Sequence, residues 1–385
     1  MKNLKKPASL TLGIEEEFQM VERETGQLSS CIHTVLPRAV PILGNHVKAE
    51  VQQSTIELVS DPLSNVTSMR AHLRDMRAQL AQILAEDGLA LISAGTHPSA
   101  LWQEQKTTEN ERYALLEEEF QEASRSILVY GLHIHVGVED PELAITLMNQ
   151  LRSWLPHLLA LSANSPFWEG RLTGIKSYRS VVWRNIFRSG IPEVFPARND
   201  FDRYVQRLIR AGHIESGRMI WWDIRPHAAY PTLEFRICDM PATLDDTIAL
   251  AALCQALVAK LTWLYQRHLT LQVLPRYFVE EHKWYASRYG LDARIFDFVQ
   301  ERHLTMRESI NELLDLVDDV LDDLGCRREI LYLRTLLSSP RGTGADRQLY
   351  VYQKNERIAD VITHLIQQTM RGIPVSVPES AASRD

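Results

Sequence analysis

The stretch LTLGIEEEFQM, residues 10–20, alternates apolar and polar residues and carries three consecutive glutamates. If this stretch is a β-strand, its side chains point alternately to the two faces of a sheet. Glu15 and Glu17 then share one face, whereas Glu16 lies among apolar residues, where it requires an edge position or a basic partner. Two carboxylates so close together repel each other unless a cation or a proton lies between them. The stretch therefore predicts either an ordinary solvated strand or a strand that presents carboxylates to a cation.

Three other segments show the same division between an ionisable face and an apolar face. Each alternates the two kinds of side chain at the two-residue period of a strand. The ionisable faces carry Glu57 in QSTIELVSDP (53–62), His133 and His135 in GLHIHVGV (131–138), and Glu234, Arg236 and Cys238 in PTLEFRICD (231–239).

Carboxylates, imidazoles and a guanidinium on one sheet face predict a cation site. Oxygen ligands with one or two histidines suit Mg²⁺ or Mn²⁺ better than Zn²⁺. Mg²⁺ usually binds together with substrate phosphates, and a guanidinium binds a phosphate through two parallel hydrogen bonds. For each segment taken alone, ordinary alternatives stay open: a solvated Glu57, a structural histidine pair, and a salt bridge between Glu234 and Arg236.

Composition and charge narrow the class of protein. The 385 residues carry a net charge of −7, which favours neither nucleic-acid nor anionic-membrane binding. The cysteines are far apart and form no CxxC pair, which indicates a reducing compartment. The N-terminal residues contain no uninterrupted apolar run of a signal peptide, so we expect a cytoplasmic protein. The apolar run 247–265 is interrupted by Gln255 and Lys260, which favours a buried core helix over a membrane span.

The order of segments predicts an α+β fold with a mostly antiparallel sheet and helices on one face. The chain has no GxGxxG and no GxxxxGK[ST] motif, which disfavours Rossmann and P-loop folds. We expect one catalytic domain over residues 1–375 and a disordered tail over 376–385. Strands are expected at 10–22, 89–95, 128–138 and 230–240, helices at 64–88, 110–127, 141–164 (bent at Pro156), 201–212, 247–265 and from 292 onward, and a long loop at 165–200.

The chain resembles the YbdK-type carboxylate–amine ligases, also called glutamate–cysteine ligase type 2, along nearly its whole length. Each motif is weak alone, but their order and spacing together are specific. The resemblance implies a glutamine-synthetase-like catalytic fold, a curved antiparallel sheet whose concave face holds divalent metals and ATP. The motifs are TLGIEEEFQ (11–19), STIELVSDP (54–62), GTHP (95–98), NERY (110–113), YGLHIHVG (130–137), ALSANSPFWEG (160–170), SYRS (177–180), WDIRPH (222–227), LEFRICDMP (233–241) and GTGADRQ (342–348).

The resemblance also implies roles for individual residues. Arg179 and Arg225, like Arg236, are expected in catalysis, where they would hold a substrate carboxylate or a phosphate, although either could be a structural arginine. The Gly-rich stretch around Arg347 could close over the nucleotide. The expected metal ligands are Glu15, Glu17, Glu57, His133 and Glu234, and the expected nucleotide contacts are Arg236, His135 and Arg347.

The activity implied by the resemblance is an ATP-dependent ligation of a small-molecule carboxylate, such as an amino acid, to an amine through an acyl phosphate. Glutamate and cysteine are the pair in the family's name, and a different pair stays open. A homodimer is expected. Two other classes also stay open: a divalent-metal-dependent hydrolase that uses the same carboxylates and histidine to activate water, and a non-catalytic binding protein.

Overall fold

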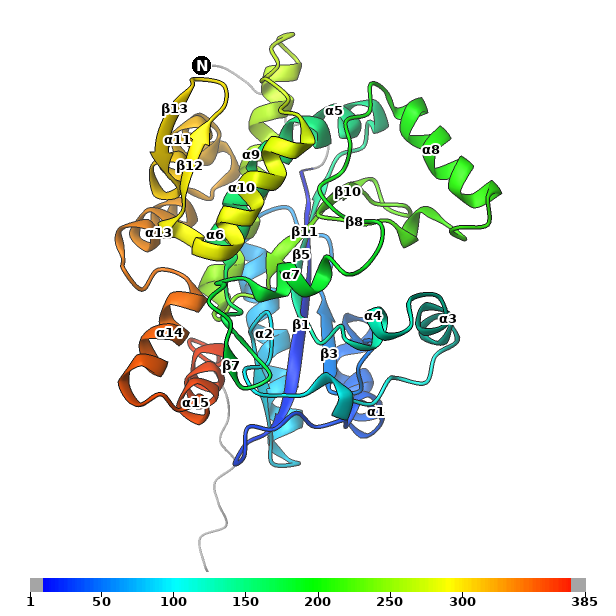
Figure 1. Cartoon of the computed structure of the whole chain (residues 1–385), viewed down its shortest axis with the longest axis vertical. Helices are drawn as coiled ribbons and strands as arrows, with labels where there is room; N and C mark the ends of the chain where they lie inside the picture. The colour runs from blue at the N-terminus through cyan, green and yellow to red at the C-terminus, as the bar shows by residue number, and fades with distance from the viewer. Residues whose placement is uncertain (1–9, 375–385) are drawn as a thin grey trace, which may run out of the picture.

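A seven-stranded antiparallel sheet forms the centre of the computed structural model, which describes residues 10–374 (Figure 1). The strand order is β10-β11-β5-β1-β3-β2, and β4 pairs with the second half of β1. This arrangement confirms the predicted α+β class. The strands are β1 (Leu12–Glu22), β2 (Val47–Ala49), β3 (Thr55–Val59), β4 (Leu89–Ile92), β5 (Gly131–Gly137), β10 (Ile224–Pro226) and β11 (Thr232–Asp239).

Two long helices cover the apolar face of this sheet. Helix α2 (Val66–Ala85) starts at Asn65, whose side chain accepts a hydrogen bond from the Ser68 N–H, and α9 (Leu244–Tyr265) starts at Thr243 in the same manner. Among the described residues, α9 alone is long and apolar enough to cross a membrane, and 78% of its apolar window is buried inside the fold. It is a core helix, as its interrupted apolar run predicts.

Two predicted helices are each divided in the structure. The segment 141–164 forms α5 (Pro141–Leu151), a 3₁₀ turn and α6 (Leu155–Ser162). The break precedes Pro156, which lies in the first turn of α6, where its missing N–H leaves no hydrogen bond unmade. The segment 110–127 forms α3 (Glu111–Phe120) and α4 (Glu122–Arg125), because Gln121 adopts a positive φ of 50°.

Two expectations about irregular and helical regions were wrong. The segment 165–200 contains α7 (Tyr178–Trp183), the start of α8 (Arg198–Arg210) and the short strands β6 (Phe167–Trp168), β7 (Arg171–Leu172) and β8 (Ser189–Gly190), which pairs with β9 (Trp221–Trp222). After residue 292 the chain first forms a hairpin of β12 (Arg294–Asp297) and β13 (Arg302–Thr305). Elements of two to six residues are too short to display a hydrophobic period.

The remaining helices surround the sheet, and the last two lie together beside its lower end in Figure 1. The remaining helices are α1 (Ile32–Leu43), α10 (Arg276–Tyr289), α11 (Met306–Leu316), α12 (Leu321–Leu324), α13 (Arg327–Ser338), α14 (Gly344–Asn355) and α15 (Ile358–Thr369). The expected tail, 376–385, lies outside the described residues.

Candidate active site

Cross-strand pairing brings the predicted ionisable side chains to one face of the sheet. Residues directly opposite each other on neighbouring strands share a face. The pairs are Glu15 with His133, Glu17 with Glu57, and Glu234 with His135. The opposite face of the same strands carries the apolar residues that pack on α2 and α9. The sheet therefore separates a hydrophobic core from a polar surface that four strands build together.

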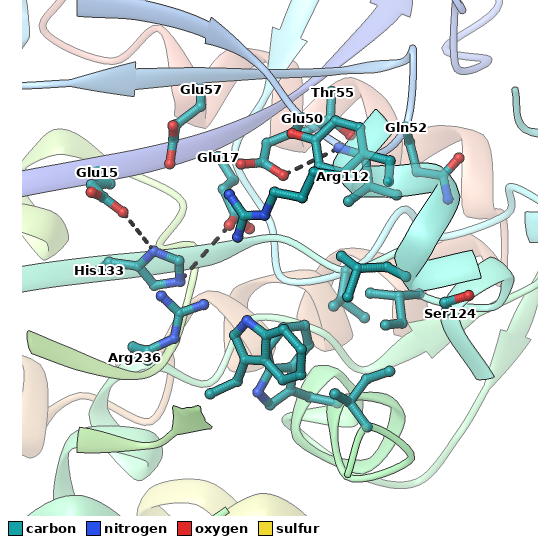
Figure 2. A pocket seen from close by; sticks show the side chains of 18 of the residues that line it. Glu15, Glu17, Glu50, Gln52, Thr55, Glu57, Arg112, Ser124, His133 and Arg236 are labelled. Atoms are coloured by element: carbon teal, nitrogen blue, oxygen red, sulfur yellow. Dashed lines mark hydrogen bonds and ion pairs between the residues drawn. The ribbon is translucent and has the colours of Figure 1, made fainter. Parts of the chain in front are cut away.

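This polar surface is the floor of a pocket of ≈420 Å³ (Figure 2). The opposite wall comes from α3, α4 and α7 and from the segment around β9. Aromatic rings and basic groups line this wall. They include Arg112, Tyr113, Phe120, Arg125, Trp183, Arg218 and Trp221. A carboxylate-rich floor facing a basic and aromatic wall can hold a cation together with a polyanion.

Three groups of side chains on the floor have the composition of metal sites. In each group one ligand atom per residue lies within 4.8 Å of the ligand atoms of the other two. The groups are Glu15, Glu57 and His133; Glu15, His135 and Glu234; and Glu17, Glu50 and Glu57. The five residues predicted as metal ligands all belong to these groups. His135, predicted as a nucleotide contact, and Glu50 join them.

The tautomer of His133 leaves one ring nitrogen available to a cation. Burial, with Arg236 nearby, lowers the pKa of His133 to about 4, so the ring is neutral at pH 7. Its Nδ1 hydrogen bonds to Glu15 Oε2 at 3.0 Å, which makes Nδ1 the donor. Nε2 then carries the lone pair, and it faces Glu17 Oε1 at 3.8 Å, beyond hydrogen-bond distance (Figure 2).

The carboxylates on the floor repel one another. Burial raises the pKa of Glu57 well above its usual range, and the charges of Glu15 and Glu50 raise it further. Burial and Glu50 also raise the pKa of Glu17 to about 7. Burial, followed by the charge of Glu15, raises the pKa of Glu50 as well. Four carboxylates held this close favour either a proton or a divalent cation between them, and their oxygen donors fit Mg²⁺ or Mn²⁺.

A bulge in β11 places Arg236 over the floor. Between the pairs Phe235–Ile134 and Cys238–Leu132, two residues of β11 oppose the single residue His133. Alternation resumes one residue out of phase, so Cys238 lies on the apolar face in the core. The prediction that Cys238 shares a face with Glu234 was therefore wrong.

Arg179 holds this bulge through the backbone. Its guanidinium donates to the carbonyl oxygens of Ile237 at 3.2 Å and Arg236 at 3.1 Å. Gly131 lies directly beneath the guanidinium. A Cβ at this position would collide with Arg179 Nη2, so the close approach requires glycine. The Gly131 N–H donates to Glu17 Oε2 at 2.5 Å. Arg179 lines the pocket, as expected, and the contacts that it makes support the shape of the site.

Glu234 is paired with two arginines. Arg225 Nε donates to its Oε2 at 2.8 Å and Nη2 to its Oε1 at 3.2 Å, while Arg236 Nη1 also binds Oε1. Burial opposes ionisation of Glu234, but the two guanidinium charges outweigh burial and hold its pKa well below the usual range. The salt bridge between Glu234 and Arg236, which the sequence left open as an alternative to a functional site, therefore exists, and both of its residues line the pocket.

Two predicted site residues, His135 and Arg347, do not line the pocket, but His135 lies beside Glu15 and Glu234, whereas Arg347 lies elsewhere in the fold. Its guanidinium pairs with Asp246 at 2.5 Å and with the Gly342 carbonyl at 2.9 Å. The rest of the Gly-rich motif is also structural: Thr343 and Asp346 form the capping box of α14, and Gln348 binds Asn164.

Glu50 and Arg112 are among the pocket residues that the sequence did not indicate. Glu50 follows the short strand β2, two residues after Lys48, which pairs with Glu57, so alternation from Lys48 would have indicated its face. Arg112 lies in α3 beside Glu50 (Figure 2), and no local pattern shows that this helix folds over the sheet.

Comparison with known sequences identifies the family of this chain. Residues 11–364 match the sequence model of glutamate–cysteine ligase family 2, GCS2. A protein of Solibacter usitatus, provisionally named glutamate–cysteine ligase 2, is 43% identical over 95% of this chain and 94% of its own. A protein of Chloroflexus aggregans with the same provisional name is 41% identical over 97% of this chain and 96% of its own.

Solved structures show the same fold at low sequence identity. A glutamate–cysteine ligase of Francisella tularensis, solved in complex with AMP, has a TM-score of 0.69 at 12% identity and covers 94% of this chain and 89% of its own. A bifunctional glutathione synthetase of Pasteurella multocida has a TM-score of 0.68 at 15% identity, over 93% of this chain and 52% of its own. With its match over nearly the full length, the chain belongs to glutamate–cysteine ligase family 2 and is an ATP-dependent carboxylate–amine ligase.

Proposed function

We propose that this pocket ligates an amino-acid carboxylate to a small amine in two steps. A carboxylate oxygen attacks the γ-phosphorus of ATP, which forms an acyl phosphate and releases ADP. The amine nitrogen then attacks the acyl carbon, loses a proton, and displaces inorganic phosphate to form the amide. The observation that carries this proposal is the carboxylate floor facing arginines within one pocket of a chain that belongs to a ligase family.

Glu15, Glu17, Glu57, His133 and Glu234 are proposed to hold Mg²⁺ or Mn²⁺, with Glu50 and His135 as additional donors. The donor set is oxygen-rich with one or two imidazoles, which fits these metals. When bound, the metal neutralises phosphate charge and makes the γ-phosphorus more electrophilic.

Arg236 is proposed to stabilise the phosphoryl group as it is transferred. Its guanidinium is buried beside the floor carboxylates, and its Nε has no hydrogen-bond partner within the described residues. A buried donor without a partner is costly, so this atom is available to an incoming anion. Arg225 and Arg179 are proposed to act mainly by positioning: Arg225 orients Glu234, and Arg179 holds the bulge that carries Arg236.

The relatives' names suggest glutamate and cysteine as substrates, and we propose an α-amino acid as the carboxylate and an amino acid or another small amine as its acceptor. We further propose that the chain acts in the cytoplasm as a homodimer, with residues 1–375 as one catalytic domain and without nucleic acid or membrane as a partner.

The test is release of ADP and phosphate, with Mg²⁺, across a panel of amino-acid and amine pairs. ADP release that requires both a carboxylate and an amine, with the amide found by mass spectrometry, supports the ligase. Hydrolysis of a product amide that is unaffected by removal of ATP would instead support the metal-dependent hydrolase, and binding without turnover would support a non-catalytic protein. Arg74→Met serves as the matched control for arginine variants, because Arg74 is exposed on α2 far from the pocket.

A further inference from the structure

A second cluster of metal-binding side chains lies outside the pocket, where β3 leaves the sheet. His46 ends a 3₁₀ turn before β2, Asp61 follows β3, and His72 belongs to α2. One ligand atom of each residue lies within 4.8 Å of the ligand atoms of the other two. None of the three lines the active-site pocket. The three residues come from consecutive segments within residues 46–72, and the folding of the β2–β3 hairpin against α2 brings them together.

Hydrogen bonds place a proton on Nδ1 of both histidine rings. His46 Nδ1 lies 3.0 Å from the Val59 carbonyl oxygen, which only accepts, so Nδ1 carries the proton. His72 Nε2 accepts a long hydrogen bond from the Asp61 N–H at 3.4 Å, so its proton is on Nδ1, and a bound ion would replace this N–H as the partner of the Nε2 lone pair. A backbone carbonyl that binds the far nitrogen is the usual outer-shell support of a metal-ligating histidine.

The spacing of the donors fits an ion better than a direct contact. His46 Nε2 lies 3.7 Å from Asp61 Oδ2, which is too long for a hydrogen bond. Two ligands on a tetrahedral Zn²⁺ lie roughly 3.3 Å apart, because each bond is about 2.0–2.1 Å long. The two rings meet edge to face at 5.2 Å, an arrangement that a positive charge on both rings would oppose. A donor set of two imidazoles and one carboxylate suits Zn²⁺ better than Mg²⁺.

We propose that His46, Asp61 and His72 form a Zn²⁺-binding site that is separate from the active site and has a coordination position open to water. The side chains of His46 and Asp61 are 31% and 62% exposed, so an ion enters from solvent without any rearrangement of the core. Bound Zn²⁺ ties the end of β3, the strand that carries Glu57, to α2 and to the turn before β2. The bound ion thus cross-links these three segments at the edge of the sheet.

The experiment measures Zn²⁺ binding to the untagged full-length chain in the presence of saturating Mg²⁺, which competes for the active-site carboxylates. We compare the wild type with His46→Gln and His72→Gln, and with His33→Gln as the matched control, because His33 is exposed on α1 and outside the cluster. The expected result is one Zn²⁺ per chain in the wild type and the control, and binding weakened at least ~10-fold in each cluster variant. Zn²⁺ at about 100 times its dissociation constant should raise Tm by about 3 °C in the wild type but not in the cluster variants.

Two outcomes would overturn the proposal. Equal Zn²⁺ stoichiometry and affinity in the wild type and in both cluster variants would place the ion elsewhere. Loss of the bound Zn²⁺ in Glu57→Gln, with retention in His72→Gln, would assign it to the active site. Circular dichroism without Zn²⁺ distinguishes loss of ligands from misfolding, since His46 and His72 are only half-buried and their variants should keep the spectrum of the wild type.

Discussion

Glu16 and Arg77 form an ion pair that is completely enclosed by the protein. Both side chains are at most 1% exposed, and Arg77 Nε donates to Glu16 Oε2 at 3.0 Å while Nη2 binds Oε1. Thr247 of α9 donates to the same carboxylate at 3.1 Å. The pair therefore joins β1, α2 and α9 directly behind Glu15 and Glu17. Alternation along β1 places the charge of Glu16 on the apolar face, and Arg77 is the basic partner that this charge requires.

Removal of one member of this pair should strongly destabilise the fold. Arg77→Met leaves Glu16 buried without its counter-charge, and we expect the free energy of unfolding in urea to fall by ~3–5 kcal/mol. Arg74→Met on the same helix removes an exposed charge and should change stability by less than about 0.5 kcal/mol. The double variant Glu16→Leu/Arg77→Met should recover much of the loss, since no unpaired charge stays in the core. Equal losses in Arg77→Met and Arg74→Met would contradict this account.

Divalent cations should stabilise the chain through the carboxylate floor. Mn²⁺ or Mg²⁺ at 100 times its dissociation constant should add about 2.7 kcal/mol to the free energy of unfolding. Glu57→Gln should raise Tm in EDTA, because it removes a carboxyl whose ionisation is opposed by burial and by Glu15, Glu50 and Glu17, and it should reduce the increment that the metal gives. Glu24→Gln, an exposed control, should alter neither value. A metal increment unchanged in Glu57→Gln would remove this residue from the metal site.

Alternation located most of the floor because these strands have one apolar face, which packs on the core, and one ionisable face. A shift of one residue in β1, β3 or β5 would move every apolar side chain out of the core, so the register is strongly specified. For the same reason the sequence indicates that Glu15 and Glu17 share a face with Glu57. The antiparallel fold class and the family also follow from the sequence, and both are confirmed.

The features that the sequence did not reveal depend on contacts between distant segments. The bulge that moves Cys238 into the core is held by Arg179, which lies more than fifty residues earlier in the chain. Arg347 binds Asp246 rather than the pocket because α14 packs against the loop of Asn164. Helical period alone does not show which partner a helix will meet, so Arg77 and Arg112 had no local signal.

His97 should make the fold sensitive to mild acid. Its Nε2 donates to the Gly26 carbonyl at 2.9 Å, and Nδ1 accepts from the Ser99 and Ala100 N–H groups. Burial lowers its pKa from 6.5 to about 4, so between these values the unfolded chain binds a proton that the folded chain does not. Stability should therefore fall as the pH falls, by about 2 kcal/mol from this group between pH 7.5 and 5.

The control for this acid effect is His97→Asn. The asparagine amide oxygen keeps a hydrogen-bond acceptor near the position of His97 Nδ1, and the amide does not titrate. Its stability at pH 7.5 should be lower, and its decline towards pH 5 should be shallower than that of the wild type. Other buried histidines contribute to both curves, so the difference between the curves isolates His97. Parallel urea-unfolding curves for the two proteins across this range would show that His97 does not cause the effect.

Arg236 should affect turnover far more than folding. Glu234 stays paired with Arg225 when Arg236 is removed, so Arg236→Ala leaves no unpaired carboxylate behind and should lower Tm only modestly. If the guanidinium stabilises the transferring phosphoryl, ADP release should fall by a factor of ~10²–10³, comparable to the loss of one oxyanion donor. Arg236→Lys keeps the charge but loses the planar fork, and it should recover part of the rate. Turnover and melting are measured on the same preparations, with Arg74→Met as the control. Near-normal turnover in a clearly destabilised Arg236→Ala would assign this residue to structure instead.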